Sequence, residues 1–423
     1  MHNNYSDFKL NDPELKSKLL NWASHFNYCC FLDSNNYHPH NLKKYDILIG
    51  VSNSCSWQCN NIDSFSYLKS FSKNKWTFGH FSYDLKNEIE PELFSKNNDR
   101  IGFSDISFFI PEYLIEIKEN DIRITGKSPN KVYSEILNML PLKKSTENHI
   151  EIKNTLSKPS YINKVNALLE HIRKGDIYEI NFCQEFYAEN VNLDPALCFN
   201  ILNNHQKSPF SAYYKNNDKH LACSSPERFL KKTGGKIISQ PIKGTIKRGL
   251  TKTEDLNLID SLKSSVKEQS ENSMVVDLVR NDLCKTCETG SVKVSELMKV
   301  YSFKEVHQLI STIEGTISNN EGIKTIREAF PMGSMTGMPK YKAMELIEKY
   351  EETKRGLFSG SIGYIDPNND FDFNVIIRSI LYNESNKQLS IQTGGAITSL
   401  SSAEKEYEES LLKARAMLKV LQS

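Results

Sequence analysis

Long apolar runs, an excess of one charge sign and several common cofactor motifs are all missing from this sequence of 423 residues. No apolar stretch approaches the roughly 20 residues that a membrane helix needs. The 53 Lys and Arg residues nearly balance the 52 Asp and Glu residues, which argues against binding to nucleic acid through bulk phosphate neutralisation. The absence of HExxH, GxxxxGK[ST] and GxGxxG argues against a zincin, a P-loop protein and a dinucleotide-binding protein.

A signal peptide and a disulfide framework are missing as well. The polar start MHNNYSDFKL has neither the basic nor the apolar region of a signal peptide, and nine cysteines are an odd number spread along the chain. Two tight pairs, Cys55 with Cys59 and Cys284 with Cys287, leave open a four-thiolate zinc site, although their spacings differ. We therefore expect a soluble, cytoplasmic protein with reduced thiols and with no membrane or nucleic-acid partner.

A polar, lysine-rich stretch over residues 141–159 separates two denser parts of the chain. We predict an N-terminal region, 1–150, and a larger C-terminal region, 155–420. Strand-like runs are expected at 45–51, 76–83, 113–117, 177–186, 220–223, 236–238, 360–365, 371–381 and 389–393. Helices are expected from a cap at Ser160 to Gly175, and at 255–282, 306–313, 341–350 and 403–421. This pattern favours an α+β fold with antiparallel sheets.

Two predicted helices each carry a pair of glutamates one turn apart. Glu268 and Glu271 share one helix face, and Glu406 and Glu409 share another, which Lys413 extends. Carboxylate oxygens from separate rigid elements suit Mg²⁺, whose remaining ligands are water and substrate. A solvated face with an ordinary Glu409–Lys413 ion pair is the alternative.

Three further segments carry candidate chemistry. Arg378 lies within the apolar run FDFNVIIRSILY, where its guanidinium pairs either with a ligand carboxylate or with a core acid. Gly394 and Gly395 form either an anion-binding stretch or a plain turn. In SQPIKGTIKRG, Lys243 is either a surface lysine or a nucleophile whose pKa is lowered by burial and by nearby cations, and Glu227 in SSPERFL suits a general acid.

The order of these segments resembles the chorismate-utilising enzymes. The segments are PIKGT, ENSMVVDLVRNDL, FPMGSMTGMPK, GSIGYID, IIRSI, TGGAI and AEKEYEES, spread over residues 155–420, and FLDSNNY with WTFGHFSYDL resembles the N-terminal part of the same enzymes. The resemblance implies a layered α/β sandwich of the anthranilate synthase component I type. Such a fold has two large, mostly antiparallel sheets flanked by helices.

The resemblance also implies a cofactor and a substrate site. Mg²⁺ would be held by Glu271 and Glu409, with Glu268 and Glu406 supporting the ion and its waters. Chorismate would be held through its enolpyruvyl carboxylate by Arg378 and by backbone N–H groups near Gly394 and Gly395. Further residues expected to line the same site are Tyr364, Thr336 and Lys413.

The implied reaction is amination of chorismate at C4, which yields 4-amino-4-deoxychorismate for the synthesis of 4-aminobenzoate and folate. Lys243 would attack C2 while Glu227 protonates the departing C4 hydroxyl, and ammonia would then add at C4 and expel the lysine. Members of the family that form anthranilate usually have Ala in place of Lys243. Anthranilate formation and a chorismate-binding regulatory subunit without turnover are the alternatives.

Two positions depart from the usual pattern of the family. Glu179 stands where aminating relatives usually have Gln and water-adding relatives have Lys, and Gln308 stands where a His commonly contacts the substrate. His307 is its neighbour. We place Glu179 and Gln308 in the substrate site.

The source of ammonia follows from a further absence. No cysteine is flanked by glycines in the manner of a glutamine amidotransferase nucleophile. We therefore expect free ammonia or a separate glutamine amidotransferase subunit as the nitrogen source. No segment resembles a pyridoxal-phosphate lyase, so the product is expected to be released as aminodeoxychorismate.

Overall fold

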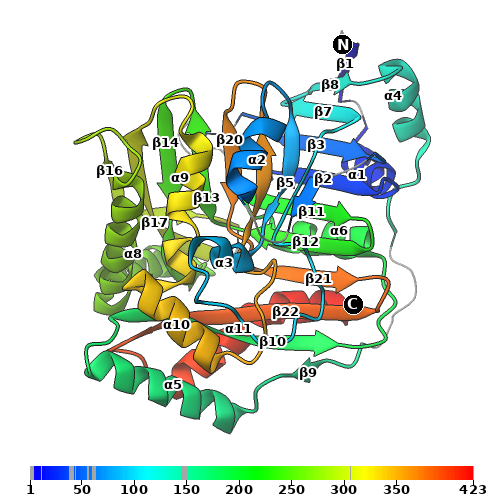
Figure 1. Ribbon diagram of the computed structural model, residues 1–423. Coiled ribbons are helices and arrows are strands. Elements are labelled where there is room, and N and C mark those ends of the chain that lie inside the picture. Colours follow the sequence, from blue (N-terminus) through cyan, green and yellow to red (C-terminus); the bar gives the residue numbers. More distant parts are fainter. Residues whose placement is uncertain are drawn as a thin grey trace.

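The computed structural model describes residues 4–10, 12–37, 42, 44–54, 57–59, 63–143, 150–304 and 306–422. Two large sheets dominate this part of the chain, and Figure 1 shows that their strands run across one another. Every pairing between named strands is antiparallel. The α+β class and the two antiparallel sheets predicted from the sequence are therefore confirmed.

The larger sheet contains strands from both halves of the sequence. Its order is β1 (Tyr5–Lys9), β8 (Asp121–Thr125), β7 (Tyr113–Lys118), β3 (Ile47–Ser52), β2 (Tyr28–Asp33), β11 (Phe210–Asn216), β12 (Lys219–Ser225), β21 (Ser379–Asn383), β22 (Gln388–Thr398), β10 (Glu179–Ala188) and β18 (Gly337–Met338), and β9 (Lys153–Asn154) pairs with β10.

The smaller sheet also joins the two halves. Its order is β15 (Ile242–Lys247), β17 (Val306–Thr316), β14 (Lys236–Gln240), β13 (Arg228–Thr233), β20 (Phe371–Asn374), β19 (Ser361–Ile365), β5 (Thr77–Phe81), β6 (Ile106–Phe109) and β4 (Trp57–Cys59), and β16 (Lys293–Ser302) pairs with β17. Because β2 pairs with β11 and β5 pairs with β19, the proposed regions 1–150 and 155–420 share both sheets. The boundary between them remains a prediction, and residues 144–149 of the connection lie outside the described part.

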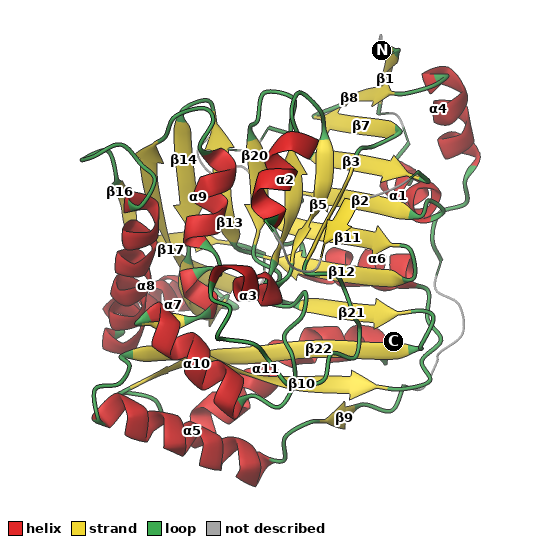
Figure 2. Cartoon of the chain, viewed as in Figure 1, coloured by secondary structure: helices red, strands yellow, loops and turns green. Residues whose placement is uncertain are grey.

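Helices cover the outer faces of the sheets, as Figure 2 shows. They are α1 (Leu15–Ser24), α2 (Ser64–Phe71), α3 (Lys86–Ile89), α4 (Pro129–Asn138), α5 (Lys158–Arg173), α6 (Pro195–Gln206), α7 (Lys252–Ser264), α8 (Val266–Cys284), α9 (Gly322–Ala329), α10 (Lys340–Tyr350) and α11 (Ala403–Leu421), with short 3₁₀ turns at Tyr83–Leu85 and Gly333–Met335. None of the helices in the described residues is both long enough and apolar enough to cross a membrane.

Three apolar cores follow from this arrangement. The first includes Phe78 of the smaller sheet and Leu221 of the larger, which lie between the two sheets. It continues on the other face of the smaller sheet, where Phe108 and Phe373 pack with Phe81, and Phe81 stacks on Phe65 of α2. A second core fills the space between the larger sheet and the helices α1, α4, α6 and α11, and a third lies beneath α5 and α10. Helix α8 packs on β15 and β17 of the smaller sheet, while α11 packs on β22 of the larger. Each sheet therefore carries one of the two helices that contain the glutamate pairs.

Several sequence predictions of elements require correction. Residues 306–313 were predicted as a helix but lie in β17, which is buried on both faces and therefore lacks the alternation that marks a half-exposed strand. The expected strand 371–381 is two strands, β20 and β21, which belong to different sheets. The single helix 255–282 is interrupted at Ser265, whose side chain caps α8. Helix α5 is capped by Ser157, not by Ser160.

Candidate active site

The two glutamate pairs meet where α8 faces α11. Glu271 on α8 and Glu406 on α11 are buried, and Lys267 lies between them. The Nζ atom of Lys267 is 2.9 Å from Oε1 of Glu406 and 3.7 Å from Oε1 of Glu271. The helix spacing read from the sequence therefore brings these carboxylates together, while Lys267 was not predicted. Its position four residues before Glu271 was the available signal.

Glycines of the underlying strands allow the carboxylates to approach the backbone. A Cβ atom on Gly395 would lie 3.1 Å from Oε2 of Glu406 and 3.5 Å from Oε1 of Glu409. A Cβ atom on Gly244, where φ is +93°, would lie 3.0 Å from Oε2 of Glu268. We call the surroundings of Glu268, Glu271, Glu406 and Glu409 the glutamate region, and three of these side chains, those of Glu268, Glu406 and Glu409, lie directly against glycine backbone.

Lys413 closes one side of this region. Its Nζ atom is 2.8 Å from Oε1 of Glu409 and donates a 2.8 Å hydrogen bond to the carbonyl of Gly394. The predicted Glu409–Lys413 ion pair is therefore present. Gly394 and Gly395 lie within β22, opposite Cys183 and Phe182 of β10, so the plain turn considered as an alternative is absent, and anion binding by their backbone stays a prediction.

Burial and neighbouring lysines shift the pKa values of the glutamate side chains. It raises the pKa of Glu271 to about 7, against the opposing effect of Lys243 and Lys267, and it raises the pKa of Glu268. Burial acts on Glu409 in the same direction, but Lys413 and Lys267 hold its pKa below the ordinary value. Within the described part of the chain, Oε1 of Glu271 and Oε2 of Glu406 are buried and accept no hydrogen bond.

Unsatisfied buried oxygens on opposed helices suit a hard divalent cation. The described residues hold no group of three His, Cys, Asp or Glu side chains already gathered around one point, and Lys267 supplies positive charge among these carboxylates. The donor set is nevertheless all oxygen, which matches Mg²⁺ better than a softer metal. The predicted metal role of the four glutamates stays a prediction.

Lys243 lies beside the carboxylates, on β15. Its ammonium is 2.6 Å from Oε1 of Glu179 on β10, and both side chains are buried. Burial lowers the pKa of Lys243, but Glu179, Glu271 and Glu227 together raise it above the ordinary value. Nearby cations were expected to lower this pKa, and that expectation is wrong because three carboxyl groups face the amine.

Glu227 and Arg378 form the opposite side of the site. Burial raises the pKa of Glu227 to about 7, and Lys243 and Arg378 act in the other direction. Arg378 follows the crossover from β20 to β21 and has a φ of +51°, so it is not inside a strand as predicted. Burial lowers its pKa, and no carboxylate of the described residues lies within ion-pair distance of it.

Gln308 and Thr336, which were predicted to line the substrate site, are both buried and differ in their hydrogen-bond partners. Gln308 on β17 donates a 3.3 Å hydrogen bond to Oγ1 of Thr245, while its buried Oε1 accepts none from the described residues. Its neighbour His307 is hydrogen-bonded instead to Asp255 and Ser302. The hydroxyl of Thr336 donates to the carbonyl of Met332 at 3.2 Å, so this side chain already has an acceptor within its own loop.

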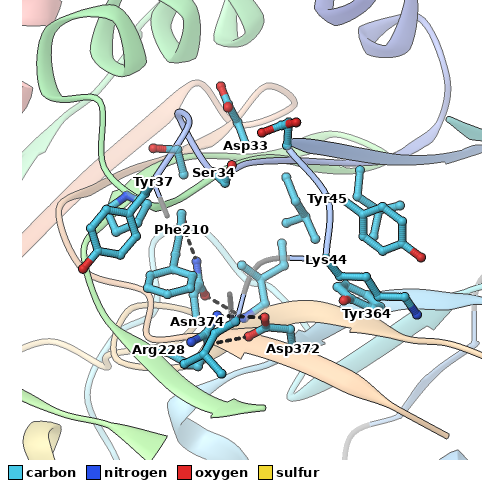
Figure 3. A pocket seen from close by; sticks show the side chains of 17 residues that line it. Asp33, Ser34, Tyr37, Lys44, Tyr45, Phe210, Arg228, Tyr364, Asp372 and Asn374 are labelled. Carbon is cyan, nitrogen blue, oxygen red and sulfur yellow. Dashed lines mark hydrogen bonds and ion pairs between the residues drawn. The ribbon is translucent and has the colours of Figure 1, made fainter. Parts of the chain in front are cut away.

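Tyr364 lies apart from the glutamates, in a separate cavity between the sheets (Figure 3). Its ring packs near Trp76 and Tyr45, with centroid distances of 5.6 and 6.3 Å. Arg228 and Asp372 form a two-pronged ion pair in the same cavity, at 2.9 and 3.1 Å. The prediction that Tyr364 lines the glutamate site is therefore not supported, because alternation along β19 directs its side chain elsewhere.

Among the described residues, no three metal-ligating side chains that include a cysteine gather around one point. Cys284 and Cys287 are free thiols at the end of α8, and Cys55 lies outside the described residues, so the four-thiolate alternative is not tested. Burial and Cys284 raise the pKa of Cys287 to about 11.

Residues 36–419 match the family model for chorismate binding enzymes. The chain belongs to this family. It is 40% identical over 308 residues to the chloroplastic aminodeoxychorismate synthase of Arabidopsis thaliana, a match that covers 72% of the chain but only 33% of the plant protein. It is also 32% identical over 351 residues to aminodeoxychorismate synthase component 1 of Escherichia coli, covering 81% of the chain and 76% of that relative.

The fold agrees with a solved structure. Anthranilate synthase component I from Streptococcus pneumoniae superposes with a TM-score of 0.76 at 23% identity, over 99% of the chain and 92% of that protein. At this identity the likeness shows the fold alone. The chain spans about a third of the length of the Arabidopsis relative.

Proposed function

We propose that the protein aminates chorismate at C4 to give 4-amino-4-deoxychorismate. The observation that carries this proposal is the buried amine of Lys243 beside the glutamate region, between Glu179 and Glu227. An amine in that place can form a bond to the substrate ring, which Ala at the same position could not. Relatives named aminodeoxychorismate synthase support the same assignment.

We propose Mg²⁺ as the cofactor, held by Glu271 and Glu409 with Glu268 and Glu406 in support. The unsatisfied oxygens of Glu271 and Glu406 and the bare backbone at Gly395 fit this ion. When bound, Mg²⁺ would neutralise the ring carboxylate of chorismate. Glu268, Glu271 and Glu409 all lie within electrostatic reach of Lys243, so carboxylate charge and amine share one site.

Three side chains of the protein would bind the substrate, protonate the leaving group and attack the ring. Arg378, which has no carboxylate partner in the described residues, would bind the enolpyruvyl carboxylate through its planar fork. Because the pKa of Glu227 is raised to about 7, about half of the molecules hold its proton at pH 7, and the protonated form would donate that proton to the C4 hydroxyl as it leaves. Lys243 attacks C2, and ammonia then adds at C4 and releases the lysine. Covalent catalysis replaces one difficult substitution with two easier displacements.

We propose that ammonia comes from a glutamine amidotransferase subunit or from solution. The described cysteines are free thiols, and none of them is flanked by glycines. Isolated protein should therefore use ammonium salts and not glutamine. The product would enter 4-aminobenzoate and folate synthesis in the cytoplasm.

The test is to incubate purified protein with chorismate, Mg²⁺ and ammonium and to identify the product by mass and ultraviolet spectrum. The proposal predicts a product with the mass of chorismate in which an amino group replaces one hydroxyl, with the pyruvyl ether retained. Anthranilate would instead show loss of pyruvate and would establish the alternative lyase. Chorismate binding without any product would establish a regulatory subunit.

A further inference from the structure

The ion pair of Lys243 and Glu179 joins the two sheets at the centre of the site. Its Nζ–Oε1 distance is 2.6 Å, and the two residues are 8% and 6% exposed. Lys243 belongs to β15 of the smaller sheet and Glu179 to β10 of the larger. A buried contact of this kind fixes the direction in which the amine points.

A nucleophilic amine must first lose a proton, and the surroundings of Lys243 oppose that loss. The carboxyl groups that act on it come from three kinds of element: Glu179 from β10, Glu227 from the loop before β13, and Glu268, Glu271 and Glu409 from the helices. Cations also belong to this network, since Arg378 acts on Glu227 while Lys267 and Lys413 act on the helix glutamates. The ammonium form is therefore favoured until a defined acceptor removes its proton.

Only one of these carboxyl groups is positioned as that acceptor. Glu227 must hold its own proton to release the C4 hydroxyl, and the helix glutamates are assigned to the cation. Glu179 is the carboxylate that accepts a hydrogen bond from Lys243 in the described structure. Glu179 would therefore act as the base and Glu227 as the acid toward the same substrate, because their different surroundings favour different protonation states.

We propose that Glu179 positions Lys243 and takes the Nζ proton as the amine attacks chorismate. This inference rests on the proposed function. The proton moves to Oε1 of Glu179, the Nζ–C2 bond forms, the two ring double bonds shift, and the C4–O bond breaks as Glu227 protonates the departing oxygen, so that water leaves. Ammonia then forms the C4–N bond and the C2–Nζ bond breaks. Glu179 returns its proton to Lys243, and Glu227 regains one from the new ammonium group.

The test compares wild-type protein with Glu179→Gln at several pH values, with the concentration of free ammonia held constant. The amide keeps the shape but cannot take a proton, so kcat should fall about 100-fold or more while KM for chorismate changes less than about threefold. Because the variant depends on the small fraction of free amine, its deficit should shrink by up to about tenfold per pH unit. Acetate should partly restore Glu179→Ala.

Glu185→Gln is the matched control, since Glu185 is a buried carboxylate on the same strand and accepts a 2.7 Å hydrogen bond from Ser390. Any decrease in kcat of Glu185→Gln should be independent of pH and should not be reversed by acetate. Glu179→Asp, which keeps a carboxylate, should fold and retain the wild-type pH profile at a reduced rate. A pH-independent deficit in Glu179→Gln without acetate rescue of Glu179→Ala would overturn the inference. Wild-type protein that forms no aminodeoxychorismate would instead overturn the proposed function.

Discussion

Two clusters of buried charge behave differently in this protein. In the first, both prongs of the Arg355 guanidinium contact Glu351, at 2.6 and 2.9 Å, and further hydrogen bonds reach the carbonyls of Met335 and Asn181. In the second, Oε1 of Glu271 and Oε2 of Glu406 accept no hydrogen bond from the described residues, although Oε1 of Glu406 pairs with Lys267, and Arg378 forms no ion pair in the described part of the chain.

This difference in satisfied partners distinguishes a structural cluster, Arg355 with Glu351, which we call the scaffold cluster, from the candidate ligand site. A buried charge with every partner supplied by the fold stabilises the loops that it joins, and here Arg355 ties β10 to the turn before β18. A buried charge with partners missing costs free energy in the folded protein unless a ligand provides them. The glutamate region and Arg378 therefore mark where a cation and an anion are expected.

The largest effect is expected for Glu271→Gln and Glu409→Gln. Each amide removes charge that a divalent ion needs, so Mg²⁺-dependent turnover should be abolished while the circular dichroism spectrum is unchanged. Glu408→Gln is the matched control, because Glu408 adjoins Glu409 but pairs with Lys158 at 2.9 Å. Full activity of either site variant with excess chelator would disprove the metal assignment.

Lys243→Ala should reduce aminodeoxychorismate formation by about 10² to 10⁴-fold while chorismate binding survives, because only the nucleophile is lost. Lys247→Ala, an exposed residue at the end of the same strand, should leave the rate unchanged. Mass spectrometry of wild-type protein quenched during turnover should find a substrate-sized adduct on the peptide around Lys243. If Lys243→Ala forms the same product at an unchanged rate, Lys243 is not the nucleophile and contributes only its charge to the site.

Substitutions in the scaffold cluster should lower the stability of the folded protein. Glu351→Gln leaves the buried Arg355 uncompensated and should lower the free energy of unfolding by about 3–5 kcal/mol, measured by urea denaturation. Arg378→Met should cost much less stability, since no carboxylate partner is lost, but should weaken chorismate binding. The reverse outcome, with Arg378 stabilising and Glu351 dispensable, would break the comparison between the clusters.

The smallest effect concerns pH. The pKa of Glu227 is raised to about 7, so this acid is protonated below that pH and loses its proton above it. At constant free ammonia, kcat/KM should therefore decline as pH rises through about 7. Glu227→Gln should be slower throughout and should lack this decline. A decline that persists in Glu227→Gln would assign it to another group.

The sequence predicted the elements whose patterns are local. Helix α11 has the predicted bounds 403–421, because its apolar stripe and acidic first turn are both encoded within one segment. The glutamate faces followed from the same helical spacing. Strand β17 was predicted as a helix because its neighbours in the sheet bury both faces, which only the tertiary structure supplies.

The parts of the site that depend on distant segments could not be read from the sequence. The Lys243–Glu179 pair joins residues 64 positions apart, and its effect on the amine reversed the expected pKa shift. Arg378 was expected inside one continuous strand because apolar residues flank it on both sides. The crossover between sheets that places it at the site leaves no mark in hydrophobic periodicity.

Diffraction from crystals soaked with Mn²⁺ and chorismate tests the central claim most directly, because Mn²⁺ replaces Mg²⁺ at oxygen sites and scatters anomalously. The account predicts an anomalous peak between α8 and α11, within coordination distance of Glu271 and Glu409, with the enolpyruvyl carboxylate on Arg378. A metal or chorismate bound only in the cavity of Tyr364 and Arg228, with the glutamate region empty, would contradict it (Figure 3).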